Sequence, residues 1–262
     1  MKWGTMYGPE YVNILYSMIA RNITGPFELF CFTDDPTGIR AEVRCYPLPE
    51  LGCEIPPDVP GKWKKQALWG QTLFDLNGVA LFLDLDCVIV DNIDGYFEYG
   101  HPDDVITARN WVRLFGKQAQ TSVFRFRIGS HPYMLDDLRA DPAGISRRYR
   151  MEQNYVTAHI RGGVKFWPEA WTKHYGVHCL GPWPIRCWRT PVLPRGAKIV
   201  TFPGRPKPPN AIIGRWSDNV PVGSPWAHWR WVWENRHRLK NLRKHIAHYV
   251  RPCPWLAEHW RL

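Results

Sequence analysis

Two aspartates, Asp84 and Asp86, interrupt the most apolar stretch of the sequence, residues 79–91. A run of apolar, partly β-branched residues predicts a strand that is buried on both faces in the centre of an α/β sheet. Because side chains alternate along an extended segment, both carboxylates should project to the same side. Paired charges at the end of a buried strand need a positive partner, and a divalent cation carrying a diphosphate would supply it. Alternatively, both aspartates simply cap the strand and face water.

Helices and short strands are expected to alternate around this stretch. Apolar residues recur at helical spacing in 10–22 and 63–74, and strand patterns occupy 28–32 and 42–48. This order is typical of an α/β fold with a mostly parallel sheet and helical crossovers. Further strands are predicted at 103–109, 122–127 and 198–202, and further helices at 131–140, 151–160 and 234–250.

The N-terminus is short for such a fold. Only Met1, Lys2 and Trp3 precede the loop 4–9, whereas a parallel α/β domain should begin with a strand. The first strand is therefore expected to be very short, or the true start codon lies upstream; a fold that tolerates a clipped edge is the alternative. The first residues lack the apolar core of a signal peptide, and no stretch approaches the ~20 apolar residues of a membrane span.

The 262 residues are enough for one large α/β domain or two small ones. The seven cysteines are odd in number and include no Cys-x-x-Cys pair, which fits neither a disulfide framework nor a zinc site and favours a reducing cytosol. Fifteen tryptophans suggest stacking surfaces or an interface.

Positive charge is concentrated at the C-terminal end. Residues 186–262 contain fifteen Lys and Arg against three Asp and Glu, whereas residues 1–185 contain nineteen against twenty-one. This asymmetry predicts an anionic partner for a basic, Trp-rich, helical C-terminal extension, residues 216–262, that follows the main domain, residues 1–215. A basic amphipathic helix with tryptophans can lie on an anionic membrane surface, and we expect this for 226–250. Single-stranded nucleic acid, which basic and aromatic residues can also bind, is the less favoured partner. Packing on its own domain is the other alternative.

Four segments, in this order, resemble GT-A glycosyltransferases. The resemblance spans most of residues 2–209 and is closest to the bacterial proteins related to glycosyltransferase family 8, which include galactosyltransferases of lipopolysaccharide assembly and the glycogenins. The segments that carry it are 2–13, 31–35, 83–86 and 204–208, and 254–261 looks like the endings of the same bacterial proteins.

The resemblance implies a GT-A, Rossmann-like fold and a metal-dependent transfer of a hexosyl group from a nucleoside-diphosphate sugar to a saccharide or lipid-linked acceptor. Asp84 and Asp86 match the family's DxD motif and would hold Mn²⁺ or Mg²⁺, with Asp86 as the direct ligand and Asp84 nearer the ribose. The reaction would belong to polysaccharide or lipopolysaccharide biosynthesis in the cytoplasm, peripherally at the inner face of the membrane. Resemblance to family 8 also favours retention of configuration.

Other residues are assigned to the donor by the same resemblance. Small residues let the backbone approach a nucleotide, and lysine is a point charge suited to phosphate. The donor-binding residues implied by the resemblance are Gly4, Thr5 and Tyr7 at the base and ribose, Lys207 with Gly204 at the diphosphate, and Lys65 and Gln120.

Glu152 and Gln153 match the position near the transferred sugar and are the candidate catalytic residues. Three positions depart from the family pattern. The late-loop histidine that completes the metal site is replaced, because its candidate positions are Thr201 and Pro203. Gln120 stands where relatives have Asn, and Glu152 where they have Asp. A degenerate member that only binds nucleotide sugar or an anionic partner is therefore an alternative. A nucleotidyltransferase is a second one, against which the absent glycine-rich phosphate loop counts.

Overall fold

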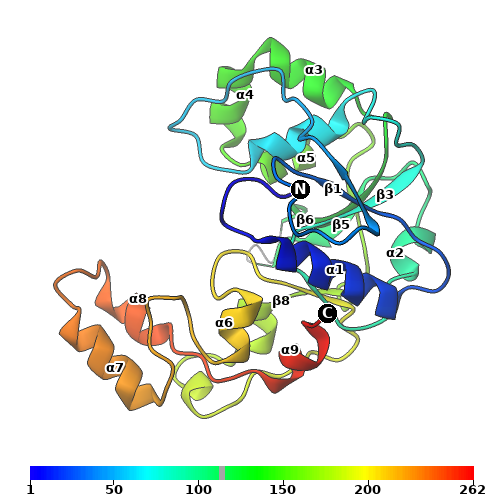
Figure 1. Cartoon of the computed structure of the whole chain (residues 1–262). Helices are drawn as coiled ribbons and strands as arrows, with labels where there is room; N and C mark the ends of the chain where they lie inside the picture. The colour runs from blue at the N-terminus through cyan, green and yellow to red at the C-terminus, as the bar shows by residue number, and fades with distance from the viewer. Residues whose placement is uncertain (112–115) are drawn as a thin grey trace.

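The computed structural model describes residues 1–111 and 116–262 as an α/β fold with three small sheets (Figure 1). The ladders are mixed, since three strand pairs are parallel and three are antiparallel. The predicted α/β class is confirmed, but the strands are not mostly parallel as expected. The sheets are β1 (Leu29–Phe32) with β2 (Val43–Tyr46); β3 (Val79–Leu83), β6 (Ala119–Arg127), β5 (Ile106–Arg109) and β7 (Lys165–Phe166) in that spatial order; and β4 (Val88–Ile89), β9 (Ile199–Thr201) and β8 (Thr172–His174).

Helix α1 (Pro9–Asn22) anchors the first of two hydrophobic cores. It begins with proline in its first turn, where the missing N–H is not needed, and buries Val12, Leu15 and Met18. These side chains pack in one cluster with β4 and β9. The predicted helix over 10–22 is confirmed.

The second core lies under a helical layer at the other end of the molecule (top of Figure 1). Trp69 stacks on Phe124 of β6 with ring centroids 5.6 Å apart. The predicted helix over 63–74 is a shorter 3₁₀ helix, η1 (Trp63–Trp69). The remaining helices of this layer are α3 (Tyr133–Ala140), α4 (Pro142–Tyr149) and α5 (Glu152–His159).

The expectation that Asp84 and Asp86 share one extended strand is wrong. β3 ends at Leu83, and the Cys87 N–H donates to the Asp84 carbonyl (3.1 Å), which closes a turn before β4. Both aspartates therefore lie in the turn at the C-terminal end of β3. The strand is also not buried on both faces, because every residue from Val79 to Phe82 is partly exposed.

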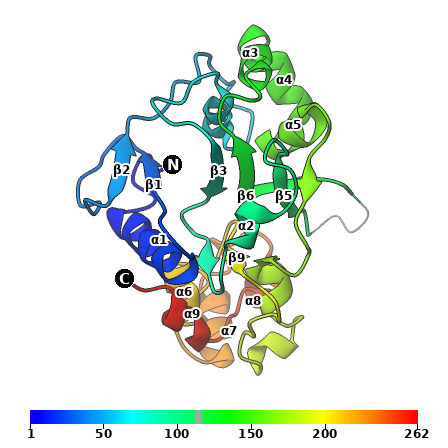
Figure 2. The ribbon, with the colours of Figure 1, turned by 90° about the vertical axis from the view of Figure 1, so that its right-hand side faces the viewer.

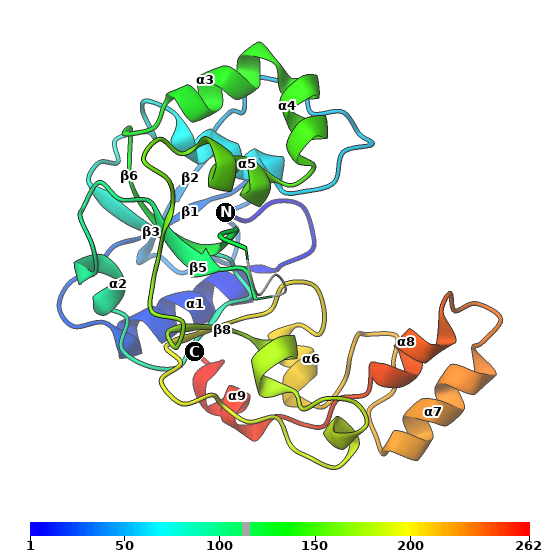
Figure 3. The same ribbon diagram turned by 180° about the vertical axis from the view of Figure 1, so that it is seen from behind.

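The predicted helix over 234–250 is also wrong. α7 (Pro225–Glu234) ends where that helix was expected to begin, and α8 (Leu242–Ala247) follows a turn. The turn closes at Asn241, which adopts a left-handed conformation (φ 61°) while its side chain accepts the Lys244 N–H. α7 and α8 project from the rest of the molecule as a hairpin (Figure 3).

The chain then returns to the main body. In α9 (Pro254–His259), Leu256 is fully buried in the first core, together with Trp260 just after the helix. The domain boundary expected between residues 215 and 216 stays a prediction. The segment that projects from the rest of the molecule consists of α7 and α8. Within residues 1–111 and 116–262, no helix is long and apolar enough to cross a membrane.

Candidate functional site

A cleft of about 670 Å³ opens at the C-terminal end of β3. It is bounded by the N-terminal loop, the start of α5 and the loop before α6 (Pro208–Ile212). Gly4 and Thr5 lie in the N-terminal loop but do not line the cleft. Nine of the eleven residues predicted from the sequence do line it: Tyr7, Lys65, Asp84, Asp86, Gln120, Glu152, Gln153, Gly204 and Lys207.

Asp86 is paired with both a hydroxyl and an ammonium group. Its Oδ2 accepts a hydrogen bond from the Tyr7 hydroxyl (2.8 Å) and lies 2.5 Å from the Lys207 ammonium nitrogen. Burial raises the pKa of Asp86, as does the neighbouring Asp84, whereas Lys207 and Tyr7 oppose this rise. Burial and the contact with Asp86 raise the pKa of Tyr7, which therefore stays a neutral donor. The result is a three-residue unit built from the N-terminal loop, the β3 turn and the late loop.

Asp84 is paired with a different lysine. Its Oδ1 lies 2.6 Å from the ammonium nitrogen of Lys65, which also donates to the Thr121 carbonyl (3.3 Å). Lys65 is only 6% exposed. Burial lowers its pKa, but Asp84 and Glu152 outweigh that effect, so the pKa is raised and the lysine stays charged. The predicted contact of Lys65 with a donor would therefore compete with this ion pair.

The donor set does not fit a divalent cation as it stands. Such cations take several oxygen ligands, yet Asp86 Oδ2 and Asp84 Oδ1 each already face an ammonium group. Thr201, one of the two candidate positions for the family's histidine, is 1% exposed and donates its hydroxyl to the Lys173 carbonyl (3.2 Å). Among the described residues, no group of three or more His, Cys, Asp or Glu side chains could hold a metal.

The segment 31–35, which carries part of the family resemblance, supports the cleft without lining it. Asp34 Oδ2 accepts the Gly4 N–H (2.9 Å), and the Lys2 ammonium donates to the Asp35 carbonyl (2.9 Å). Gly4 has φ +62°, a conformation that favours glycine. Asp34 and Gly4 together therefore set the path of the loop that carries Tyr7.

Glu152 is held in place rather than free. It is 5% exposed, and its Oε2 accepts the Lys62 N–H (2.9 Å) across 90 residues of sequence. A carboxylate in this position fixes the loop before η1 against the start of α5. The neighbouring Gln153 lines the cleft and is half-buried, which leaves its amide better placed to meet a substrate.

Sequence reasoning missed several lining residues. Trp3 lines the cleft, and the ammonium groups of Lys62 and Lys64 lie 5.8 and 5.9 Å from its ring centroid. Arg215 also lines the cleft and is fixed by hydrogen bonds to Asn210 (2.9 Å) and Asp218 (3.0 Å). Trp3 lies within the segment 2–13 that carries the resemblance but was assigned no role, and only the C-terminal excess of positive charge pointed toward Arg215. Aromatic rings beside fixed cations suit a nucleobase joined to phosphate.

Solved structures share this architecture. The galactosyltransferase LgtC, in complex with donor and acceptor sugar analogues, is similar over 76% of this chain and 85% of its own, with a TM-score of 0.54 and 13% identity. An active-site mutant of LgtC gives a TM-score of 0.52 at 13% identity over the same shares, 76% and 85%. The bifunctional glycosyltransferase WbbM, in its apo form, is similar over 78% of this chain and 45% of its own, with a TM-score of 0.52 and 12% identity.

These likenesses define the class of fold. The chain has the GT-A fold, as found in glycosyltransferases related to family 8, which confirms the fold predicted from the sequence resemblance. No family model matches the sequence, and no curated protein sequence is similar to it.

Proposed function

We propose that this protein is a glycosyltransferase that moves a hexosyl group from a nucleoside-diphosphate sugar to a saccharide or a lipid-linked acceptor. The observation that carries the proposal is the unit formed by Lys207, Asp86 and Tyr7 at the C-terminal end of β3 in a GT-A fold. Open α/β sheets bind ligands at the carboxyl ends of their strands. The cleft also has the size of a small-molecule site.

The positively charged side chains of the cleft would stabilise the leaving diphosphate. The bond from the sugar C1 to the diphosphate oxygen breaks, the acceptor hydroxyl oxygen bonds to C1, and the hydroxyl proton passes to an oxygen of the departing diphosphate. Negative charge accumulates on the departing group in the transition state. An ammonium and a hydroxyl that point at this charge stabilise the transition state more than the ground state. Lys207 and Tyr7, which meet at Asp86, can supply both, and Arg215 and Lys62 add charge at the rim.

A second form of the proposal keeps the metal dependence that the resemblance implies. It places Mn²⁺ or Mg²⁺ on Asp84 and Asp86 and turns Lys207 toward the diphosphate. It requires both ammonium groups to leave their carboxylates, which are 2.6 and 2.5 Å away. The first form leaves the Lys65–Asp84 pair in place and requires only Lys207 and the Tyr7 hydroxyl to turn from Asp86 toward the diphosphate, so we favour it.

Binding measurements separate these forms. The purified chain is titrated by calorimetry with UDP- and GDP-sugars, once in EDTA and once in Mn²⁺. Equal binding of one sugar nucleotide in both buffers supports the favoured form, and binding that needs Mn²⁺ supports the metal-dependent form. A folded protein that binds none of them in either buffer contradicts the proposal. Binding without transfer or hydrolysis would support a degenerate member, and release of pyrophosphate from a nucleoside triphosphate would support a nucleotidyltransferase.

We further propose that α7 and α8 attach the enzyme to an anionic membrane surface at the cytoplasmic face. Trp226 and Trp233 of α7 are 76% and 65% exposed. Val232 and His228 are buried, and the His228 ring bonds the His245 carbonyl (2.9 Å), which holds α7 against α8. Exposed aromatic rings beside cations favour a lipid interface. The exposed cations of the hairpin are Arg230, Arg236, Arg238, Lys240, Arg243 and Lys244.

A further inference from the structure

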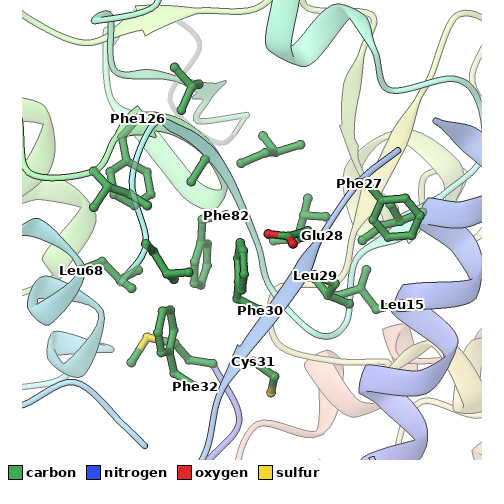
Figure 4. A pocket seen from close by; sticks show the side chains of 18 of the residues that line it. Leu15, Phe27, Glu28, Leu29, Phe30, Cys31, Phe32, Leu68, Phe82 and Phe126 are labelled. Atoms are coloured by element: carbon green, nitrogen blue, oxygen red, sulfur yellow. The ribbon is translucent and has the colours of Figure 1, made fainter. Parts of the chain in front are cut away.

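Two cavities outside the cleft differ in chemistry. The larger, a slot of about 180 Å³ between β1 and β3, is lined by apolar side chains such as Phe30 and Phe82 (Figure 4). In the described part of the chain, no Lys, Arg or His side chain lines this slot. The smaller, with a volume of about 120 Å³, is lined by Arg109, Lys173 and His178 together with aromatic rings. We call the smaller one the basic cavity.

The basic cavity lies beside the cleft. Figure 2 shows β3, β6 and β5 side by side. Ala108 of β5 lines the basic cavity and pairs in register with Gln120 of β6, which lines the cleft. In a second ladder, Lys173 of β8 pairs with Val200 of β9, shortly before Pro203 of the cleft. The two sites therefore lie on neighbouring residues of the same ladders.

Arg109 ends β5 at the wall of the basic cavity. The β5–β6 ladder changes register between Thr107 and Ala108, just before Arg109, and such irregularities re-aim side chains. The guanidinium lies over the Phe166 ring (5.2 Å) and 3.6 Å from a Glu169 oxygen, which is too long for a hydrogen bond. Within the described residues it has no closer carboxylate, so its N–H donors can still bind an anion.

Lys173 and His178 supply the other nitrogen groups of the basic cavity. Lys173 forms no ion pair in the part of the chain that the structure describes. Burial and the nearby Lys173 ammonium lower the pKa of His178, whose Nδ1 accepts the His174 N–H (3.0 Å). With a neutral His178, two cations face a single carboxylate, that of Glu169, so the wall carries a net positive charge.

Aromatic rings and a small volume define the rest of the basic cavity. Trp111 is held by its Nε1–H, which donates to the Thr172 carbonyl (3.2 Å), and Trp167 is buried on the same wall. Rigid aromatic rings suit the apolar face of a sugar. A volume of about 120 Å³ equals roughly four water molecules of the liquid. It is therefore enough for a carboxylate or a phosphate with part of the ring that carries it.

We propose that the basic cavity is a subsite for an anionic group, a carboxylate or a phosphate ester, on the saccharide that accepts the transferred sugar. The assignment to the acceptor rests on the proposed function. Arg109 binds oxygens of the group through its planar fork, and Lys173 adds a point charge. Because the basic cavity adjoins the cleft, an acceptor held there by its acidic group keeps its hydroxyl groups close to the donor.

Titration with matched sugars tests the ligand class. Glucose, glucuronic acid and glucose 6-phosphate share one ring and differ in charge, and ligand-observed NMR at constant ionic strength gives the three affinities. We expect one of the acids to bind about tenfold tighter than glucose, because hydrogen bonds to charged groups are the stronger ones. The tighter acid identifies the carboxylate or the phosphate as the recognised group. Equal affinity for all three sugars would overturn the proposal, as would inorganic phosphate that binds as tightly as the better acid.

Variants locate the bound acid. Lys173→Gln and Arg109→Gln should each weaken the better acid by about threefold to tenfold. Lys165→Gln is the matched control, since this exposed lysine of β7 lines neither the basic cavity nor the cleft. Lys207→Gln should weaken nucleotide binding and spare the acid. Loss of the acid in Lys207→Gln but not in Lys173→Gln would place it in the cleft and overturn the proposal.

These titrations contain no nucleotide, so their outcome is separate from the test of the proposed function. If nucleotide sugars bind but the acids bind no better than glucose, the subsite is overturned and the proposed function stands. If an acid binds through Lys173 while every nucleotide sugar fails to bind, the site for an acidic sugar is supported. Its assignment to an acceptor is then overturned together with the proposed function.

Discussion

The ammonium nitrogen of Lys207 lies 2.5 Å from Oδ2 of Asp86, although 121 residues separate them in the sequence. The pair joins the late loop to the turn after β3, and the Tyr7 hydroxyl contacts the same oxygen. A lysine placed here can neutralise a diphosphate without a resident cation.

Replacement of this lysine should therefore weaken nucleotide binding. For Lys207→Ala we expect a roughly tenfold to hundredfold loss of affinity for the bound nucleoside diphosphate in EDTA, since a hydrogen bond to a charged group contributes about 1.5–3 kcal/mol. Lys207→Arg should retain part of the affinity because the charge is kept. Calorimetric titration measures both, and unchanged affinity in Lys207→Ala would contradict the assigned role.

The Lys65–Asp84 pair should matter for stability. Asp84→Asn leaves a buried ammonium without its counter-charge, and removal of one partner of a buried pair costs about 3–5 kcal/mol at the upper end. Because Asp84 is partly exposed, we expect a loss of roughly 1–3 kcal/mol in urea unfolding. Lys65→Met combined with Asp84→Asn should recover part of it. If the double variant is as unstable as the sum of the two single variants, the pair is not coupled.

The conformation of Gly4 should link the loop to binding. Gly4→Ala and Gly78→Ala both add a side chain at positive φ, +62° and +84°, and neither Cβ would meet another atom within 4 Å. Each should lower the free energy of unfolding by about 1 kcal/mol through backbone strain. Only Gly4→Ala should also weaken nucleotide binding, because only Gly4 lies in the loop that carries Tyr7. Equal nucleotide affinity in the two variants would show that the conformation of this loop does not contribute to nucleotide binding.

Membrane attachment should depend on the exposed tryptophans of α7. The double variant Trp226→Ser, Trp233→Ser should lose most flotation with phosphatidylserine-containing liposomes, because both rings would enter the interface. Trp188→Ser is the matched control, since Trp188 is 66% exposed outside the hairpin. Deletion of 216–262 is unsuitable, because it also removes Leu256 and Trp260 from the core. Undiminished flotation of the double variant would rule out this surface.

Acid should destabilise the hairpin. His248 stacks on Trp216 with ring centroids 4.1 Å apart, and burial with neighbouring positive charge lowers its pKa to about 4. The unfolded chain then binds a proton that the folded chain does not, so stability falls as the pH drops from about 6.5 toward 4. His248→Phe keeps an aromatic ring on Trp216 but cannot titrate. Its urea midpoint should therefore depend less on pH over this range, and an unaltered pH dependence would exclude His248 as a contributor.

Most helices and strands could be predicted from the sequence because their apolar residues recur with helical or strand periodicity. It predicted the cleft residues through the resemblance, whereas their pairing depends on tertiary packing. Nothing local indicates that Lys65 pairs with Asp84 and Lys207 with Asp86, because these contacts join distant segments. The extended path predicted through Asp84 failed for a related reason: alternation of side chains does not reveal a tight turn stabilised by a single backbone hydrogen bond.

The packing of the C-terminal end against α1 has a consequence for biosynthesis. Trp260 meets Tyr11 with ring centroids 5.1 Å apart, and Arg21 donates to the His259 carbonyl (2.8 Å). Helix α1 thus obtains part of its packing from residues that are synthesised much later, since Arg21 and His259 are 238 positions apart in the sequence. The part of α1 around Tyr11 remains uncovered until that segment has been synthesised, so the nascent chain should depend on chaperones until then. Premature termination near residue 250 should yield an aggregation-prone product even though the whole cleft has been made.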